Sequence, residues 1–321
     1  MKTYRSLLAA ALLMMVAIPA MAQVNNTYVI PAAANVSGAF GTHWMTRFTI
    51  FNPHLDRDLT VSVTWLPTGG AEGFEELVEL PPNSLAYSDN ILEDLYGVTN
   101  TSGALLVATF PEDNPGVPDT VFDRSFLVNS DTFNNHPNGT YGQGIAGEWI
   151  GLYDYDSDLI SSVSHGIRNS GFYRTNIGAV NLGSCGVTLY VNAYDANGNT
   201  ILSQAPFGIP PYGHMQDRLP VAVGNGSVEF FVYDPCAADD ARYAVVFPYT
   251  STIDQRTNDP SYLYPKLLAS PSILYAKGKK IDTLNVGKKI DTTYARKVRG
   301  NMLRRGTARL VQTDEGYKIT K

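Results

Sequence analysis

The chain has 321 residues, of which 44% are hydrophobic and only 17% are charged, and its formal net charge is −6. The residues after position 22 suffice for two ordinary domains, each with its own core. No stretch in that part is long and apolar enough to cross a bilayer, so the sequence excludes a mature protein with a helical membrane span.

The N-terminal segment has the features of a signal peptide. Lys2 and Arg5 precede a short apolar run, and Ala20-Met21-Ala22 forms an A-x-A cleavage signature. No Cys follows the apolar run, so a bacterial lipid anchor is not expected. We therefore predict a signal peptide at 1–22 and an exported, soluble protein located outside the cell, at the cell surface or in the periplasm.

Two segments of the mature chain resemble one another. "WMTRFTIFNPHL" at 44–55 matches "FYRTNIGAVNLG" at 172–183, with Thr46 opposite Thr175 and Asn52 opposite Asn181. Each segment is followed by an alternating apolar strand, a Gly-containing turn and a Pro pair. Because the spacing between matched features stays nearly constant, the pattern predicts an internal duplication.

The remaining strand signals also occur in pairs. Short strands separated by frequent turns predict two tandem antiparallel immunoglobulin-like β-sandwiches, at 23–147 and 148–265, with a single two-part barrel as the alternative. Only the segments 85–97 and 292–305 are helical in character. The paired signals are turns at 66–70 and 194–198, Pro pairs at 79–84 and 208–213, strands at 103–110 and 227–234, and last strands near 120–128 and 242–250.

Three segments carry a resemblance to known proteins. "IPAAANVSGAFGTHWMTRFTIFNP" (30–53), "FYRTNIGAVN" (172–181) and "GTYGQGI" (139–145) resemble motifs of exported bacterial β-repeat proteins that have no assigned activity. Those proteins open each unit with W-R-T-D-L-x-apolar-x-N. This chain departs from that pattern at Met45, Arg47 and Asn176. The resemblance implies surface-exposed or secreted β modules and supplies no catalytic residue.

The chain has two cysteines, Cys185 and Cys236. An exported protein meets an oxidising compartment, so we predict a disulfide between them; two free buried thiols are the alternative.

No catalytic residue is predicted, because the sequence lacks G-x-S-x-G and H-E-x-x-H motifs and its five histidines are scattered. A hydrolase with a non-contiguous site remains the least favoured interpretation. No cofactor is expected. Calcium is the one metal that the sequence permits, at Asp154, Asp156 and Asp158, although an acidic inter-domain loop explains these residues more simply.

Aromatic residues gather around the junction between the two units. Flat rings of this kind can stack on sugars, whereas filling a small β core is the alternative role. The candidate glycan contacts are Trp149, Tyr153, Tyr155, Phe172 and Tyr173. Arg168 and Arg174 lie in the same region. In an acidic domain without Lys we expect such arginines to pair with nearby carboxylates, and a ligand clamp is the other possibility.

The charge changes sign near Lys266. Residues 23–265 hold 8 Arg, no Lys and 26 acids, for a net −18, whereas 266–321 hold 14 bases and 4 acids, for a net +10. We expect this C-terminal tail to be a small α+β element that binds an anionic polymer or membrane surface, docks an acidic partner, folds back on its own acidic body, or is a fused passenger. The candidate anion-binding residues are Lys279, Lys280, Lys288, Lys289, Arg296, Lys297, Arg299, Arg304 and Arg305.

These patterns favour a non-enzymatic exported β-sandwich protein that acts as a cell-surface, adhesion or matrix module with a basic attachment tail. A carbohydrate-binding module that uses the junction aromatics is the second hypothesis. The expected partners are an anionic envelope polymer or an acidic protein, with a glycan as a further candidate. Nucleic acid is not expected for an exported protein.

Overall fold

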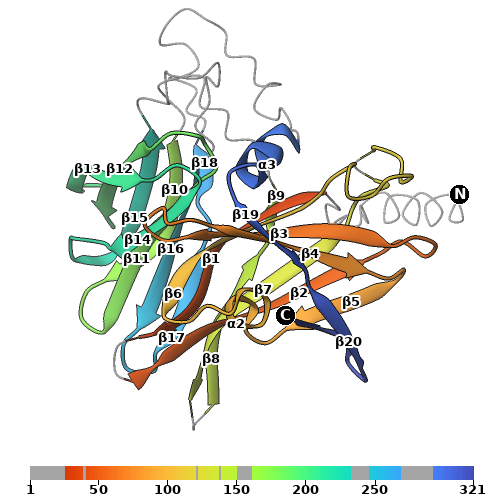
Figure 1. Ribbon diagram of the computed structural model, residues 1–321. Helices are drawn as coiled ribbons and strands as arrows, with labels where there is room; N and C mark the ends of the chain where they lie inside the picture. The colour runs from red at the N-terminus through yellow and green to blue at the C-terminus, as the bar shows by residue number, and fades with distance from the viewer. Residues whose placement is uncertain are drawn as a thin grey trace, which may run out of the picture.

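The computed structural model describes residues 26–38, 41–120, 122–136, 139–149, 161–232, 246–268 and 292–321. Within them the chain is predominantly β, built as two sandwiches and a C-terminal segment (Figure 1). The predicted signal peptide at 1–22 lies outside the described residues.

The first sandwich contains nine strands and one short helix. One sheet has the order β4-β3-β6-β1-β9, and the other has the order β5-β2-β7-β8; a short β1–β2 pairing joins them. The elements are β1 (Thr27–Ser37), β2 (His43–Asn52), β3 (Leu59–Pro67), β4 (Phe74–Leu80), β5 (Ser84–Ser88), α2 (Ile91–Tyr96), β6 (Thr101–Thr109), β7 (Leu127–His136), β8 (Gly139–Ala146) and β9 (Glu148–Trp149).

The second sandwich has the corresponding strand order. Its sheets are β13-β12-β15-β10-β18 and β14-β11-β16-β17, so each strand occupies the place of the one nine positions earlier. The elements are β10 (Ser161–Asn169), β11 (Tyr173–Asn181), β12 (Val187–Asp195), β13 (Thr200–Ile209), β14 (Gly213–Arg218), β15 (Val223–Val232), β16 (Val246–Asp254), β17 (Asp259–Leu263) and β18 (Lys266–Leu268). In both sandwiches the last strand returns to pair with the first.

One predicted strand is misplaced. The segment 120–128 is largely a turn, and the strand β7 starts only at Leu127. Arg124 explains the difference, because its buried guanidinium donates hydrogen bonds to the carbonyl oxygens of Phe110 and Val117 and so holds this segment in a loop. The apolar residues on either side of this buried arginine are typical of a strand, and the sequence alone does not indicate the loop.

Matched polar residues hold the same connections in both sandwiches. Asn52 is fully buried, and its amide donates to the carbonyls of Arg57, Leu80 and Pro81. Asn181, also fully buried, donates to the carbonyls of Cys185 and Pro210. Each amide therefore ties the chain after β2 or β11 to the Pro-pair connection.

The matched threonines make a second shared contact. The hydroxyl of Thr46 lies 2.8 Å from that of Thr132, and the hydroxyl of Thr175 lies 2.8 Å from that of Thr252. Both contacts link the two adjacent central strands of a sheet on its buried face. After each Pro pair the backbone also takes the same left-handed conformation, with φ 47° at both Asn83 and Tyr212.

Each sandwich has its own apolar core, and a third core joins them. The outer face of β1, β3 and β6 packs against the outer face of β11 and β16, and the helix α3 (Thr292–Arg299) covers the edge of this contact (Figure 1). This explains why β3 is buried on both faces while its counterpart β12 alternates between buried and more exposed residues. The third core contains Val29, Leu66, Ala104, Leu106, Ala108, Phe110, Val180, Leu182, Phe247, Ala295 and Val298.

The described part of the C-terminal tail lies on the first sandwich. After α3, β19 (Leu303–Thr307) pairs in parallel with β4. The hairpin of β20 (Arg309–Thr313) and β21 (Gly316–Thr320) follows, and β21 pairs in parallel with β5. The tail thus covers the edge strand of each sheet of the first sandwich, and edges of this kind otherwise invite pairing with other chains.

Charge pairs fix α3 in place. Arg299 lies 2.5 Å from a carboxylate oxygen of Glu75 and 2.6 Å from one of Asp113, and its guanidinium stacks on the ring of Phe110 at 4.5 Å. The side chain of Glu75 is only 2% exposed and also accepts a hydrogen bond from Ser62. The arginine therefore neutralises carboxylates that are buried beneath the helix.

The buried amides supply the first prediction. We expect Asn181→Ala to lower the free energy of unfolding by about 2–3 kcal/mol, because two carbonyl oxygens lose their donor in a buried site. Asn52→Ala should have a comparable or larger effect, since three carbonyls are affected. The measurement is denaturant unfolding, with Asn225→Ala at an exposed strand position as the control. Equal stability of Asn181→Ala and wild type would contradict this role.

The ion pairs of Arg299 with Glu75 and Asp113, beneath α3, lead to the second prediction. Arg299→Met leaves Glu75 and Asp113 buried with only the more exposed Arg304 as a nearby cation, so we expect a loss of about 3–5 kcal/mol in unfolding free energy. The matched control is Arg296→Met, because Arg296 is 46% exposed and lies 3.8 Å from Glu112.

The double variant Arg299→Met/Glu75→Gln should recover part of that loss, because the uncompensated charge of Glu75 is then removed. If Arg299→Met and Arg296→Met prove equally stable, the tail is not held by this pair.

Candidate functional site

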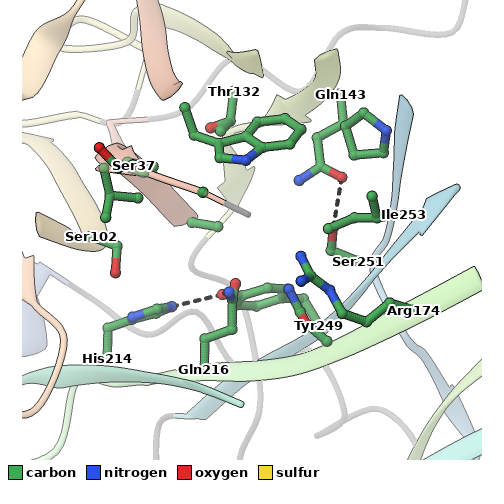
Figure 2. A pocket seen from close by; sticks show the side chains of 18 residues that line it. Ser37, Ser102, Thr132, Gln143, Arg174, His214, Gln216, Tyr249, Ser251 and Ile253 are labelled. Carbon is green, nitrogen blue, oxygen red and sulfur yellow. Dashed lines mark hydrogen bonds between the residues drawn. The ribbon is translucent and has the colours of Figure 1, made fainter. Parts of the chain in front are cut away.

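A cavity of about 260 Å³ lies between the two sandwiches (Figure 2). Residues of both units line it, and they mix small apolar groups with amides, hydroxyls, one histidine and one arginine. The lining residues are Ala32, Ala33, Ala34, Val36, Ser37, Gly38, Trp44, Ser102, Thr132, Gln143, Arg174, Asn176, His214, Gln216, Tyr249, Ser251, Ile253 and Pro260. We call this cavity the inter-unit pocket.

Strand alternation brings the second unit's side chains into the pocket. On β11, Thr175 and Ile177 face the sandwich core, so Arg174 and Asn176 project from the opposite face. On β16, Tyr249 and its alternate neighbours project from the same outer face. Much of the wall from the first unit comes from β1, where a register shift between Ile30 and Ala33 changes the pairing at the start of the lining segment.

A chain of hydrogen bonds forms the floor of the pocket. His214 is fully buried; its Nδ1 lies 2.7 Å from the hydroxyl of Thr68, and its Nε2 lies 2.7 Å from the hydroxyl of Tyr249. Tyr249 in turn donates to Gln216 at 2.8 Å. Thr68 belongs to the first unit, so the chain also connects the two sandwiches.

Burial decides the protonation state of these groups. Desolvation lowers the pKa of His214 to about 3, so the imidazole is neutral at physiological pH. Burial likewise raises the pKa of Tyr249 far above its ordinary value, so the phenol stays protonated. Both ring nitrogens of His214 already have partners, and the arrangement is suited to holding the floor rigid rather than to moving a proton.

Among the described residues that line the pocket, Arg174 is the charged one. It is half-buried, and its Nε atom is inaccessible to solvent and has no hydrogen-bond partner among the described residues. No described carboxylate lies within ion-pair distance of it, in contrast to Arg256, which pairs with Asp254 at 2.6 Å. The expected local pairing of Arg174 with an acid is therefore not found in the described part of the chain.

The predicted glycan platform is described only in part. Phe172 is 60% exposed, but the guanidinium of Arg256 lies 4.9 Å from the centre of its ring. The guanidinium of Arg168 lies 5.2 Å from the ring centre of Tyr173. Neither ring lines the inter-unit pocket. The side chains of Trp149, Tyr153 and Tyr155 lie outside the described residues.

The predicted calcium residues Asp154, Asp156 and Asp158 also lie outside the described residues. Within the described ranges, no group of three His, Cys, Asp or Glu side chains could hold a metal ion. Cys185 lies just before β12 and is not free. Because Cys236 falls outside the described ranges, its pairing with Cys185 stays a prediction.

Of the predicted anion-binding residues of the tail, only three have side chains that the structure describes. Arg296, Arg299 and Arg304 make intramolecular ion pairs with Glu112, Glu75 and Asp113. The side chains of Lys279, Lys280, Lys288, Lys289, Lys297 and Arg305 lie outside the described part. An anchoring role for this set remains a prediction, and the described pairs favour the alternative in which the tail folds back on the acidic body.

The sequence does not predict the inter-unit pocket. Its residues come from strands of both units and from one connecting turn, and no linear motif joins them. Two signals were available. Arg174 is one of only eight arginines in residues 23–265, and His214 follows the second Pro pair closely.

The buried histidine supplies the third prediction. Its folded-state pKa lies below the unfolded value near 6.5, so its contribution to stability is complete above that value and declines as pH falls. Between pH 7 and pH 5 we expect wild type to lose about 2 kcal/mol from this group alone. The measurement is denaturant unfolding at both pH values.

In His214→Gln this component of the pH dependence should disappear, whereas His165→Gln, at an exposed position, should keep it. Identical pH dependence in wild type and His214→Gln would contradict the assignment.

In comparisons with known proteins, no family model, no curated protein and no solved structure matches the chain. The resemblance of 30–53, 139–145 and 172–181 to exported β-repeat proteins therefore stays a prediction. Among the described residues, no helix has the length and apolar character that crossing a membrane requires.

Proposed function

We propose that this chain is an exported, non-enzymatic β-sandwich protein that acts as a cell-surface, adhesion or matrix module, and that its inter-unit pocket binds a small polar ligand. The observation that carries the proposal is the pocket itself. Both sandwiches build it, and its walls combine polar side chains with small apolar ones. Sites between domains that mix apolar walls with a few polar groups are typical of ligand binding.

The chemistry of the pocket supports binding rather than catalysis. A general base needs a pKa near the working pH, and His214, with a pKa of about 3, is too weakly basic. No Asp or Glu is found among the described lining residues. The hydroxyls that line the pocket thus lack a neighbouring group that could activate them as nucleophiles.

The tail contributes to this proposal as a structural element. Its described arginines bind the carboxylates of the first sandwich, and its strands cover β4 and β5. We propose that residues 292–321 stabilise and close the first sandwich. Attachment to an envelope polymer would then depend on the lysines of 277–289 or on other surfaces.

The strand pairing supports an immunoglobulin-like origin by duplication. In an immunoglobulin constant domain strand B pairs with E, E with D, C with F, and F with G. The strands β10, β15 and β12 have the first pattern, and β11, β16 and β17 have the second; β1, β6, β3 and β2, β7, β8 repeat both. The place of strand A, beside B, is taken by β18 or β9 from the end of each unit. We propose that both units are copies of one such domain.

Carbohydrate binding is the second candidate function. The pocket lies at the junction of the units and includes Trp44 together with amide side chains, which are the groups that stack on sugar rings and bind their hydroxyls. In this case the sugar would bind between the sandwiches rather than on Phe172 and Tyr173, whose rings already have guanidinium groups close by.

A pocket-filling variant tests the proposal. Ala34 lines the pocket from β1, so Ala34→Leu adds bulk there, and Ala71→Leu in an exposed loop is the matched control. The probe is a panel of neutral and acidic mono- and disaccharides, with affinity measured by calorimetry.

We expect at least one sugar to bind wild type and Ala71→Leu, and to bind Ala34→Leu at least tenfold more weakly. Binding that Ala34→Leu leaves unchanged, or no binding by any member of the panel, would count against the pocket as the site.

A further inference from the structure

We propose that the inter-unit pocket recognises an oxyanion, with a ligand carboxylate bound by Arg174 and by the side-chain amides of Gln143 and Gln216. This inference rests on the proposed binding function and names the chemical class of the ligand. The ligand is a small acid, of which an acidic monosaccharide is an example that also fits the second candidate function.

The first argument is the position of Arg174. Figure 2 shows its guanidinium directed into the pocket from β11, between Gln143 and Gln216. Its Nε atom has no solvent-accessible surface and no hydrogen-bond partner among the described residues. A buried cationic donor without an acceptor is costly, and a bound ligand, ion or water is one way in which such a donor gains its acceptor.

The second argument is the contrast between Arg174 and three other arginines of the chain, which have carboxylates close by. Arg47, Arg57 and Arg124 each lie within 3.5 Å of at least one aspartate. Arg174 has no such carboxylate among the described residues, and burial together with the positive charge of Arg218 lowers its pKa. An anion in the pocket would offset both effects, because it supplies the missing negative charge.

The third argument is the orientation of the amides. The side-chain oxygen of Gln143 accepts a hydrogen bond from Ser251, and that of Gln216 accepts one from Tyr249. With both oxygens engaged, each amide has its NH₂ group left to donate. The pocket therefore offers a guanidinium and two amide donors and, in its described lining, no carboxylate that would repel an anion.

The fourth argument is size. A volume of about 260 Å³ is at the small end of ligand sites. The apolar side chains of Ala32, Ala34, Val36 and Ile253 also line it, so the ligand has an uncharged body beside its acidic group. An acid with a compact body fits this description better than a bare inorganic ion.

The test compares matched ligands and matched variants. Glucuronate and glucose differ mainly in the carboxylate, and acetate and phosphate represent a carboxylate without a body and a different oxyanion. Calorimetry and thermal unfolding are carried out on wild type, Arg174→Gln, Arg174→Lys and the control Arg256→Gln, whose arginine lies outside the pocket. A ligand that binds only the folded state raises the midpoint of unfolding.

We expect glucuronate to bind wild type and Arg256→Gln at least tenfold more tightly than glucose does, and Arg174→Gln to lose that preference. Arg174→Lys should keep part of it, because the charge remains while the planar fork is lost. Without ligand, Arg174→Gln should unfold at the same temperature as wild type or higher, a result that also shows that the variant folds. Tight phosphate binding with weak glucuronate binding would assign the oxyanion to a phosphate source instead of a carboxylate.

Other outcomes separate this inference from the proposed function. If a neutral sugar binds wild type and Arg174→Gln equally and Ala34→Leu poorly, the pocket binds a ligand but the oxyanion inference is wrong. If none of the four probes binds wild type, or if Arg174→Gln binds glucuronate as wild type does, the inference is also overturned.

Discussion

The apolar outer face of β1, β3 and β6 is the constraint on which the rest of the structure depends. A sandwich needs only its inner faces to be apolar, yet Val29, Leu66 and Leu106 lie on the outside of the first one and are fully buried. Water must be excluded from this face, and two elements exclude it: the outer face of β11 and β16, and the helix α3. The inter-unit pocket is lined by further residues of β1, β11 and β16.

In the second sandwich, the corresponding outer face of β10, β12 and β15 contributes no described residue to the third core. The pair Thr64 and Leu106 of β3 and β6 corresponds to Asn192 and Glu229 of β12 and β15. There the amide of Asn192 and the hydroxyl of Tyr194 donate to the carboxylate of Glu229. Burial, together with this carboxylate, raises the pKa of Tyr194 to about 12. One sandwich thus has an apolar face in the contact, and the corresponding face of the other carries polar side chains at this position.

Much of each sandwich follows from local sequence, and the pocket does not. The match of Thr46 and Asn52 with Thr175 and Asn181 located the central strands, because these side chains contact chain segments within their own unit. Alternation identified β3 and β12 but could not show that β3 is covered on both faces, since that depends on a neighbour distant in sequence. The same limit applies to Arg299: its charge indicated a solvent-facing tail, and only the position of Glu75 shows that the charge is neutralised internally.

The two sandwiches differ in how they accommodate an arginine on corresponding sheet faces. On the outer face of β2 in the first unit, Arg47 stacks on Phe133 at 4.7 Å and lies within 3.5 Å of Asp89 and Asp131. The charge of Arg47 is thus balanced by carboxylates of its own unit, and its side chain is partly exposed. A ligand anion would therefore add little to its stabilisation. On the equivalent face of β11, Arg174 is enclosed by the first unit, and no described acid accompanies it. The corresponding sheet surface thus has its charge balanced internally in the first unit and lacks a described counter-ion in the second. The arginine without a described counter-ion is the one that the packing of the two units has enclosed, and enclosure strengthens every electrostatic interaction that a ligand could make there.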